Sequence, residues 1–101
     1  MNIVYQTTNA NTPSILTTAG TAIAANSARR GWSIQNVGQN PVFINLGGTA
    51  SSTVYHYVLK GGTADSDGLG GSVSQTDGTV FTGTITFAGT TPKIVVMELA
   101  P

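Results

Sequence analysis

The chain has 101 residues, no cysteine and a formal net charge of zero, and Asp, Glu, Lys and Arg make up only 8% of it. Without thiols it has neither a disulfide framework nor a thiolate metal site, and four Lys and Arg residues cannot form the basic stripe that nucleic acid requires. Its polarity comes from 16 Thr and 8 Ser, and because Thr favours strands, we expect one small β-rich domain.

The hydrophobic pattern does not predict a membrane protein. No apolar run approaches the roughly 18 residues of a membrane helix, and the first residues lack the basic start and apolar stretch of a signal peptide. We therefore expect a soluble protein made inside a cell. A surface with so few charges is poorly protected against association, so we also hypothesise that other chains cover part of it.

Residues 1–13 form a distinct N-terminal region. They begin with an apolar patch of Ile3, Val4 and Tyr5 and continue as a polar, turn-rich sequence. This pattern predicts an arm or a first edge strand ahead of a β-domain over residues 14–101. In that domain, residues 14–18 and 21–25 are predicted as short strands, although the Ala-rich second segment is also compatible with a helical turn.

The clearest strand pair lies in the middle of the chain. Residues 31–37 and 42–46 are strand-like, and residues 38–41 between them have the Gly, Asn and Pro of a turn. In the first of these strands, Trp32, Ile34 and Asn36 alternate with polar positions, so they are expected to share one face.

Residues 53–60 carry mostly apolar side chains on both faces of a predicted strand. Such a strand is usually central in a sandwich or covered by a neighbouring subunit. We therefore place Tyr55, His56 and Tyr57 in a candidate partner-binding surface. The alternative for His56 is a packed histidine inside its own domain.

The last third of the chain predicts a loop followed by a hairpin. Residues 61–72 hold five glycines and no strand pattern, whereas Asp77-Gly78 is the strongest hairpin signal, joining residues 72–76 to residues 80–87. Gly83 on the apolar side of the second strand suggests a bulge or a close approach of another backbone. Residues 93–99 form the last predicted strand.

The strand and turn signals together predict an all-β fold. Seven or eight strands with turns at short intervals indicate one small antiparallel β-sandwich or barrel. A jelly roll is the first choice, and an immunoglobulin-like sandwich is the second.

The residue inventory offers little for catalysis. His56 is the one histidine, and neither a nucleophile elbow nor a Walker phosphate loop is present. Asp65 and Asp67 resemble the opening of a calcium loop, but Leu69 and Thr76 stand where further oxygen ligands would be needed. We therefore predict a solvated turn there, with a weak structural calcium site as the alternative. We assign no catalytic residue, no metal ligand and no cofactor to the chain.

Arg29 and Arg30 are the only adjacent like charges in the chain. They can grip carboxylates or carbonyls of a partner chain, or one of them can stack on Trp32 or bond loop carbonyls of its own subunit. We favour the intramolecular role for Arg29, and we include Arg30 among the candidate partner-binding residues with both roles open. Trp32 is expected in core or intersubunit packing rather than in a sugar-stacking platform.

The order of several short motifs resembles that of a known family, the small capsid-accessory proteins of tailed bacteriophages (decoration, cement or head-fibre type). The residues that carry this resemblance are Asn26, Arg29, 34–36, Gly38, 41–44, 47–48, 59–62, 81–85 and 95–98. They are strand and turn residues rather than a chemical signature. Phe81 stands where the relatives often have Tyr.

The resemblance implies a function that composition alone does not. Proteins similar to this one bind the outer face of an assembled icosahedral head, commonly as trimers, and strengthen it against internal DNA pressure. It implies a non-enzymatic virion protein on the capsid exterior, made in the bacterial cytoplasm, whose partners are the major capsid protein and further copies of itself. Residues 1–13 would then be an arm that pairs with a capsid strand or an adjacent subunit.

Two alternatives stay open. One is a fibre or adaptor module of the phage head or tail, which predicts a partner other than the major capsid protein. The other is a carbohydrate-binding β-sandwich, which would need Trp32, Tyr55 or Tyr57 exposed beside polar side chains.

Overall fold

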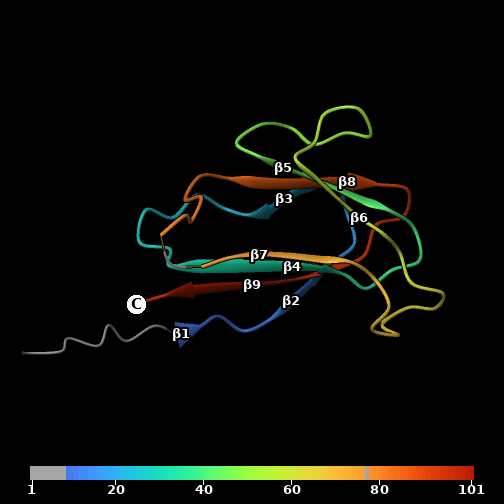
Figure 1. Cartoon of the computed structure of the whole chain (residues 1–101), viewed down its shortest axis with the longest axis horizontal. Coiled ribbons are helices and arrows are strands. Elements are labelled where there is room, and N and C mark those ends of the chain that lie inside the picture. The colour runs from blue at the N-terminus through green and yellow to red at the C-terminus, as the bar shows by residue number, and fades with distance from the viewer. Residues whose placement is uncertain (1–8, 77) are drawn as a thin grey trace, which may run out of the picture.

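The computed structural model describes residues 9–76 and 78–101. The candidate partner residues Ile3, Val4 and Tyr5 lie outside the described residues, as does Asp77. Within the described part, all regular secondary structure is strand, arranged as two antiparallel sheets that face each other (Figure 1). None of it forms a helix with the length and apolar character that crossing a bilayer would require.

The first sheet, sheet A, has β9 and β4 at its centre. Its strands, in spatial order, are β1 (Asn9–Ala10) and β2 (Ser14–Leu16), which both pair with one edge of β9 (Ile94–Ala100), then β4 (Gly31–Asn36) and β7 (Ser72–Gln75). The described end of the predicted N-terminal region therefore lies against the last strand of the chain.

The second sheet, sheet B, has four strands in the described part of the chain. In spatial order they are β3 (Gly20–Ile23), β8 (Ile85–Gly89), β5 (Val42–Leu46) and β6 (Tyr57–Leu59), so that β3 and β6 lie at its two edges. The all-β fold predicted from the sequence, a small antiparallel β-sandwich or barrel, is confirmed, and of these two forms the chain adopts the sandwich. The described residues form nine strands rather than seven or eight, because β1 is a separate two-residue strand.

The strand pairs are nested within one another. β2 pairs with β9, β3 with β8, β4 with β7 and β5 with β6, and every pair is antiparallel. The chain is therefore one long hairpin folded over so that its strand pairs alternate between the two sheets. The connection between β5 and β6 is the tip of this hairpin.

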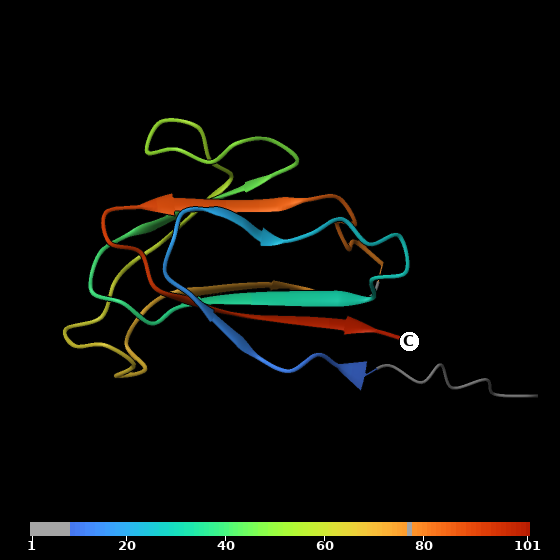
Figure 2. The ribbon, with the colours of Figure 1, turned by 180° about the vertical axis from the view of Figure 1, so that it is seen from behind.

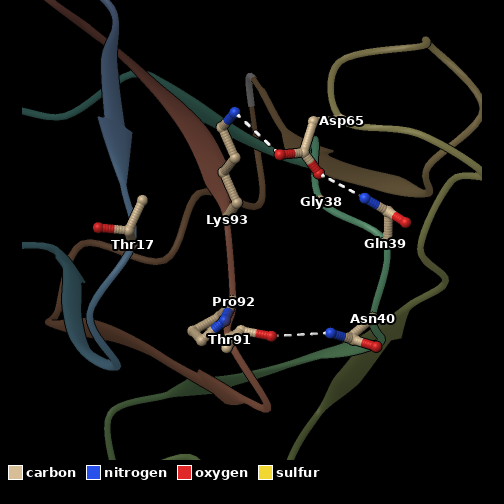
Figure 3. Close-up of a pocket in the computed structure, with 8 residues that line it drawn as sticks. All are labelled: Thr17, Gly38, Gln39, Asn40, Asp65, Thr91, Pro92 and Lys93. Atoms are coloured by element: carbon tan, nitrogen blue, oxygen red, sulfur yellow. Dashed lines mark hydrogen bonds and ion pairs between the residues drawn. The ribbon is translucent and has the colours of Figure 1, made fainter.

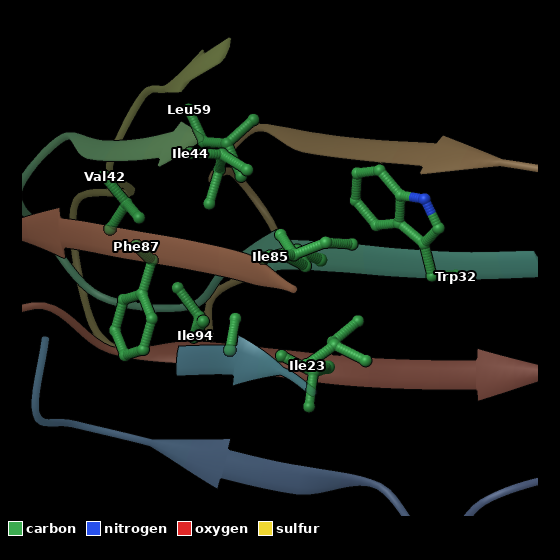
Figure 4. Packing of buried hydrophobic residues seen from close by; sticks show 11 residues of the cluster. Ile23, Trp32, Val42, Ile44, Leu59, Ile85, Phe87 and Ile94 are labelled. Atoms are coloured by element: carbon green, nitrogen blue, oxygen red, sulfur yellow. The ribbon is translucent and has the colours of Figure 1, made fainter. Parts of the chain in front are cut away.

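The core lies between the sheets and follows the alternation of each strand. Trp32, Ile34 and Asn36 of β4 share one face, as predicted, and this face points inward, so that all three are almost fully buried. Sheet B contributes the facing side chains, which include Ile44 and Phe87 (Figure 4). Burying an apolar side chain of this size contributes roughly 1.5–3 kcal/mol, so this layer is the main source of stability.

The predicted hairpin at Asp77-Gly78 is wrong. β7 pairs with β4 in sheet A, whereas β8 pairs with β3 and β5 in sheet B, so the chain crosses between sheets here. Gly78 does adopt the positive φ of a turn, 93°. Asp77-Gly78 indicates a turn from local sequence alone. The pairing partners of β7 and β8, in contrast, are distant in sequence and depend on the nested topology.

The long strands predicted over residues 53–60 and 80–87 are also wrong. Only Tyr57–Leu59 of the first is strand, and it lies at the edge of sheet B instead of its centre. In residues 80–87, regular pairing begins at Ile85. The Ser51 hydroxyl accepts hydrogen bonds from the N–H groups of Thr53 and Val54, which offers this backbone a turn in place of a sheet ladder.

Candidate interaction surface

The segment between β5 and β6 projects from the sandwich. Both views show it as a loop standing out beyond sheet B (Figures 1 and 2). Val54 on this loop is 54% exposed, Tyr55 is 45% exposed, and Val58 on the adjoining β6 is 51% exposed. Phe43 of β5 lies opposite Val58 in the sheet and packs its ring against Tyr55, with centroids 5.0 Å apart. We call Phe43, Val54, Tyr55 and Val58 the apolar patch.

The loop that carries the patch is held by its own hydrogen bonds. The Ser51 N–H donates to the Val54 carbonyl oxygen (2.9 Å), and the Ser51 hydroxyl accepts from the Val54 N–H (3.0 Å). The N–H of Ala50, which is buried, donates to the Thr86 hydroxyl on β8 (2.9 Å). The patch is therefore presented by an ordered turn anchored to sheet B.

His56 fixes the second end of this loop. Its N–H donates to the Ile44 carbonyl oxygen (2.7 Å), and its ring Nδ1 accepts a hydrogen bond from the Leu46 N–H (3.0 Å). The neutral ring therefore carries its proton on Nε2. Because both partners belong to β5, His56 orients the neighbouring Tyr55 over the outer face of sheet B.

The structure separates the two tyrosines that flank His56. Tyr55 lies on the surface in the apolar patch, whereas Tyr57 is half-buried, pairs with Ile44 and packs against the core. Tyr55 and His56 therefore lie at one surface, whereas Tyr57 lies beneath that surface and packs against the core.

Arg30 lies at a different place. Its N–H donates to the Leu99 carbonyl oxygen of β9 (2.8 Å), which puts it at the end of sheet A, whereas the apolar patch is on sheet B. The side chain is half-buried, and its Nε donates to no acceptor among the described residues. The candidate residues of the sequence therefore do not form a single site.

Arg29 has the intramolecular role that we favoured from the sequence. Its side chain is fully buried, its Nε donates to the Glu98 carboxylate (2.8 Å), and one terminal nitrogen donates to the carbonyl oxygens of Phe81 (2.7 Å) and Gly83 (3.0 Å). The second terminal nitrogen donates to the Ala24 carbonyl oxygen. We call these five residues the Arg29 clamp. It joins three segments that are distant in sequence, and guanidinium geometry suits such multiple acceptors.

Trp32 is a core residue. It is 1% exposed, and its indole N–H donates to the Gln75 side-chain oxygen (2.9 Å), which also accepts from the Phe81 N–H (2.9 Å). It therefore offers no exposed face for stacking on a sugar. Gly83 faces the Phe81 ring rather than another backbone, since a Cβ placed there would lie 2.6 Å from a ring carbon.

The two acidic side chains of the glycine-rich loop bind different partners. The Asp67 carboxylate accepts from the N–H groups of Thr63, Ala64 and Leu69 and from the Thr63 hydroxyl. These bonds, above all those from Leu69 and Ala64, lower the pKa of Asp67 to about 2. Asp65 turns the other way, toward Gln39 and Lys93. A cation would have to displace these donors, so the geometry favours the structural turn.

In residues 9–76 and 78–101, no three His, Cys, Asp or Glu side chains gather as a metal site would require. Neither a family model, nor a curated protein, nor a solved structure matches this chain. The best candidate for a functional site is therefore the apolar patch.

Sequence reasoning found only part of this patch. Val54 and Val58 were missed as surface residues, because an apolar strand is normally taken to be buried. The sequence feature that could have indicated an exposed loop here is Ser51-Ser52-Thr53, because a run of hydroxyl residues commonly forms a turn rather than a strand.

Proposed function

We propose that this chain is a non-enzymatic structural protein that binds the outer surface of an assembled phage head and stabilises it. The observation that carries the proposal is the apolar patch, which an ordered loop presents on the outer face of sheet B. The motif resemblance to small capsid-accessory proteins supplies the class of partner.

The chemistry of the patch suits docking to a protein surface. Tyr55 and Phe43 are aromatic anchors with few rotatable bonds, and aromatic residues in this setting commonly dominate binding energy. Because Ser51 and His56 already order the loop, little conformational entropy remains to be lost on binding. Among the described strands of sheet B, β6 has only β5 as a partner, so its outer edge can accept an added strand.

The strand order supports a more specific fold, and we infer that the sandwich is a jelly roll. A jelly roll is one long antiparallel hairpin rolled into two sheets, and the nested pairs from β2–β9 to β5–β6 have that order. Jelly rolls are frequent in viral structural proteins and in lectin domains. This support is a fold-level analogy.

Weak single contacts are sufficient if the protein engages the head through several copies. We propose a homotrimer, because a trimer engages three equivalent capsid sites at once and raises the effective affinity without stronger individual contacts. Light scattering behind a sizing column tests this directly on the 10.3 kDa subunit. A particle of three subunits is expected, and a monomer at all concentrations would contradict the trimer.

The proposed function is tested by co-sedimentation with heads. Heads assembled from the major capsid protein of the genome that encodes this chain are mixed with the purified protein and pelleted. We expect the wild-type protein to pellet at a fixed ratio to the capsid protein. The double variant Tyr55→Ser, Val58→Ser should remain in the supernatant, since it removes two anchors from the patch.

A control variant separates specific docking from nonspecific hydrophobic association with the heads. Ile15 is 60% exposed on sheet A, away from the patch, so Ile15→Ser removes an exposed apolar side chain outside the patch and should bind as the wild type does. Equal binding by wild type and the Tyr55 and Val58 double variant would reject the patch. Failure of the wild type to bind heads, with binding to isolated tails or fibres, would favour the fibre or adaptor alternative.

A further inference from the structure

A second candidate site lies at one end of the sandwich and shares no residue with the apolar patch. It is a cavity of about 500 Å³, within the range of small-molecule sites (Figure 3). Four chain segments contribute to its lining: the β2–β3 connection, the β4–β5 turn, the glycine-rich loop and the β8–β9 turn. The lining residues are Thr17, Gly38, Gln39, Asn40, Asp65, Thr91, Pro92 and Lys93.

Backbone strain is concentrated at this cavity. In residues 9–76 and 78–101, the non-glycine residues with positive φ are Ser66 (55°) and Thr91 (42°). Thr91 lines the cavity, and Ser66 directly follows Asp65, which also lines it. Positive φ is an outlier for a β-branched residue such as Thr. Such strain commonly persists at binding sites, where the surrounding contacts hold it in place.

Hydrogen bonds between the segments fix the shape of the cavity. The Ser66 N–H donates to the Val37 carbonyl oxygen (2.7 Å), and the Gly62 N–H donates to the Gly38 carbonyl oxygen (2.9 Å), so the glycine-rich loop is attached to the end of β4. The Asn40 side-chain amide donates to the Thr91 hydroxyl (2.9 Å). The site is therefore assembled before any ligand arrives.

The charges in the cavity balance each other. Lys93 lies 3.5 Å from one Asp65 oxygen, and the Gln39 amide donates to the other (3.2 Å). A pocket with one cation and one anion favours neither a phosphate nor a metal ion. The remaining polar groups are amides and hydroxyls, which are both donors and acceptors.

From these features we propose that the cavity binds a neutral, polyhydroxylated ligand, specifically one or two residues of a saccharide. Vicinal hydroxyl groups would donate to Asp65 and accept from Lys93 and Gln39. This inference does not rest on the proposed head binding, because the apolar patch and the cavity have different residues.

Protein-observed NMR tests the proposal with named probes: glucose, galactose, mannose, N-acetylglucosamine, lactose and maltose. We expect at least one of them to shift the backbone amide signals of Gly38, Asn40 and Lys93 in a saturable way, with a Kd on the order of 1 mM. Asp65→Asn and Gln39→Ala should each weaken that binding about tenfold, which is the effect of one good hydrogen bond to a charged or polar partner.

The control variant is Gln35→Ala, which removes the same side chain from the outer face of sheet A, where Gln35 pairs with Val95. It should leave the Kd unchanged. The absence of saturable shifts with all six sugars would overturn the proposal. Shifts confined to Tyr55 and Val58 would also overturn it, since they would place sugar binding on the apolar patch.

Discussion

The Arg29 clamp and the apolar patch use polarity in opposite ways. At the clamp, a fully buried guanidinium group donates to three backbone carbonyl oxygens of partly buried loop segments. At the patch, two valines and a tyrosine are about half exposed to solvent. From residue type alone, the charged side chains of the clamp would be expected on the surface and the apolar side chains of the patch in the core.

The difference has a physical origin in the backbone. The chain crosses between the sheets near Ala24 and Phe81, and these loop carbonyls have no ladder partner. A buried carbonyl without a donor is costly, and Arg29 supplies five N–H groups at one point. At the patch, in contrast, the loop satisfies its own backbone through Ser51 and His56, so its apolar side chains remain available for a partner.

The largest expected effect is at Arg29. Arg29→Met should lower the free energy of unfolding by about 4 kcal/mol, because it leaves the Glu98 carboxylate and three carbonyl groups without their donor. Arg29→Lys should recover little, since one ammonium group cannot reach all these acceptors. Urea unfolding followed by the fluorescence of Trp32 measures both changes.

Lys93→Met is the control for Arg29. The ion pair between Lys93 and Asp65 is partly exposed, so its loss should change stability by less than about 1 kcal/mol. If Arg29→Met and Lys93→Met lowered the free energy of unfolding equally, the clamp would contribute no more than a surface ion pair. The contrast between a buried polar clamp and an exposed apolar patch would then be wrong.

Asn36 extends the same test to a neutral buried group. Its side-chain amide donates to the carbonyl oxygens of Asn40 (2.7 Å) and Leu59 (3.0 Å), and its oxygen accepts from the Gly38 N–H (2.9 Å). Asn36→Ala should therefore lower the free energy of unfolding by about 3 kcal/mol. Thermal unfolding measures the loss.

Gln35→Ala is the matched control for Asn36→Ala. Gln35 directly precedes Asn36 and lies on the opposite face of β4, so its loss should change the free energy of unfolding by at most about 0.5 kcal/mol. If Asn36→Ala lowered the free energy of unfolding no more than Gln35→Ala does, water would be replacing the three hydrogen bonds of Asn36. Buried polar groups would then contribute less to stability than the Arg29 clamp suggests.

The patch should show the reverse behaviour. Tyr55→Ser and Val58→Ser should each change the free energy of unfolding by only about 1 kcal/mol, because about half of each side chain is already exposed. Head binding should fall sharply in the same variants. A loss of several kcal/mol on urea unfolding would mean that the patch belongs to the core of its own domain.

The smallest expected effect is a pH dependence confined to the glycine-rich loop. The pKa of Asp67 is lowered in the folded protein from 3.8 to about 2. The contribution of its hydrogen bonds is therefore complete above about pH 4 and is lost as the pH falls through about 2. The amide signals of Ala64 and Leu69 should move over that range in an NMR titration.

Asp67→Asn is the control for this titration, because it cannot titrate and should leave those amide signals nearly constant with pH. Unchanged signals in the wild-type protein down to about pH 2 would contradict the role of the carboxylate in the turn.

Several elements were predictable because their cause is local. The alternation of Trp32, Ile34 and Asn36 set which face of β4 is buried, and the abundance of Thr and of turn residues indicated an all-β sandwich. An intramolecular role for Arg29 was favoured because its place matches the motif order of the resembled family, whereas its bonds to loop carbonyls, rather than stacking on Trp32, became evident only in the structure. The exposure of Val54 and Val58 did not follow, because the sequence does not specify which strand lies at an edge.

The pairing of distant segments was decided only by tertiary structure. Asp77-Gly78 has the chemistry of a hairpin turn, yet β7 and β8 lie in different sheets because each finds its partner on a strand far away in sequence. The cavity beside Asp65 and Thr91 likewise draws on four segments that are distant in sequence, so no single local pattern indicates it.

The sequence by itself therefore determined the fold class and the inward faces of the strands, since these depend on alternation over a few residues. The tertiary structure decided which polar groups are buried and which apolar groups are exposed. The reason is that hydrogen-bond partners and free edges are properties of the assembled sheets, not of any one strand.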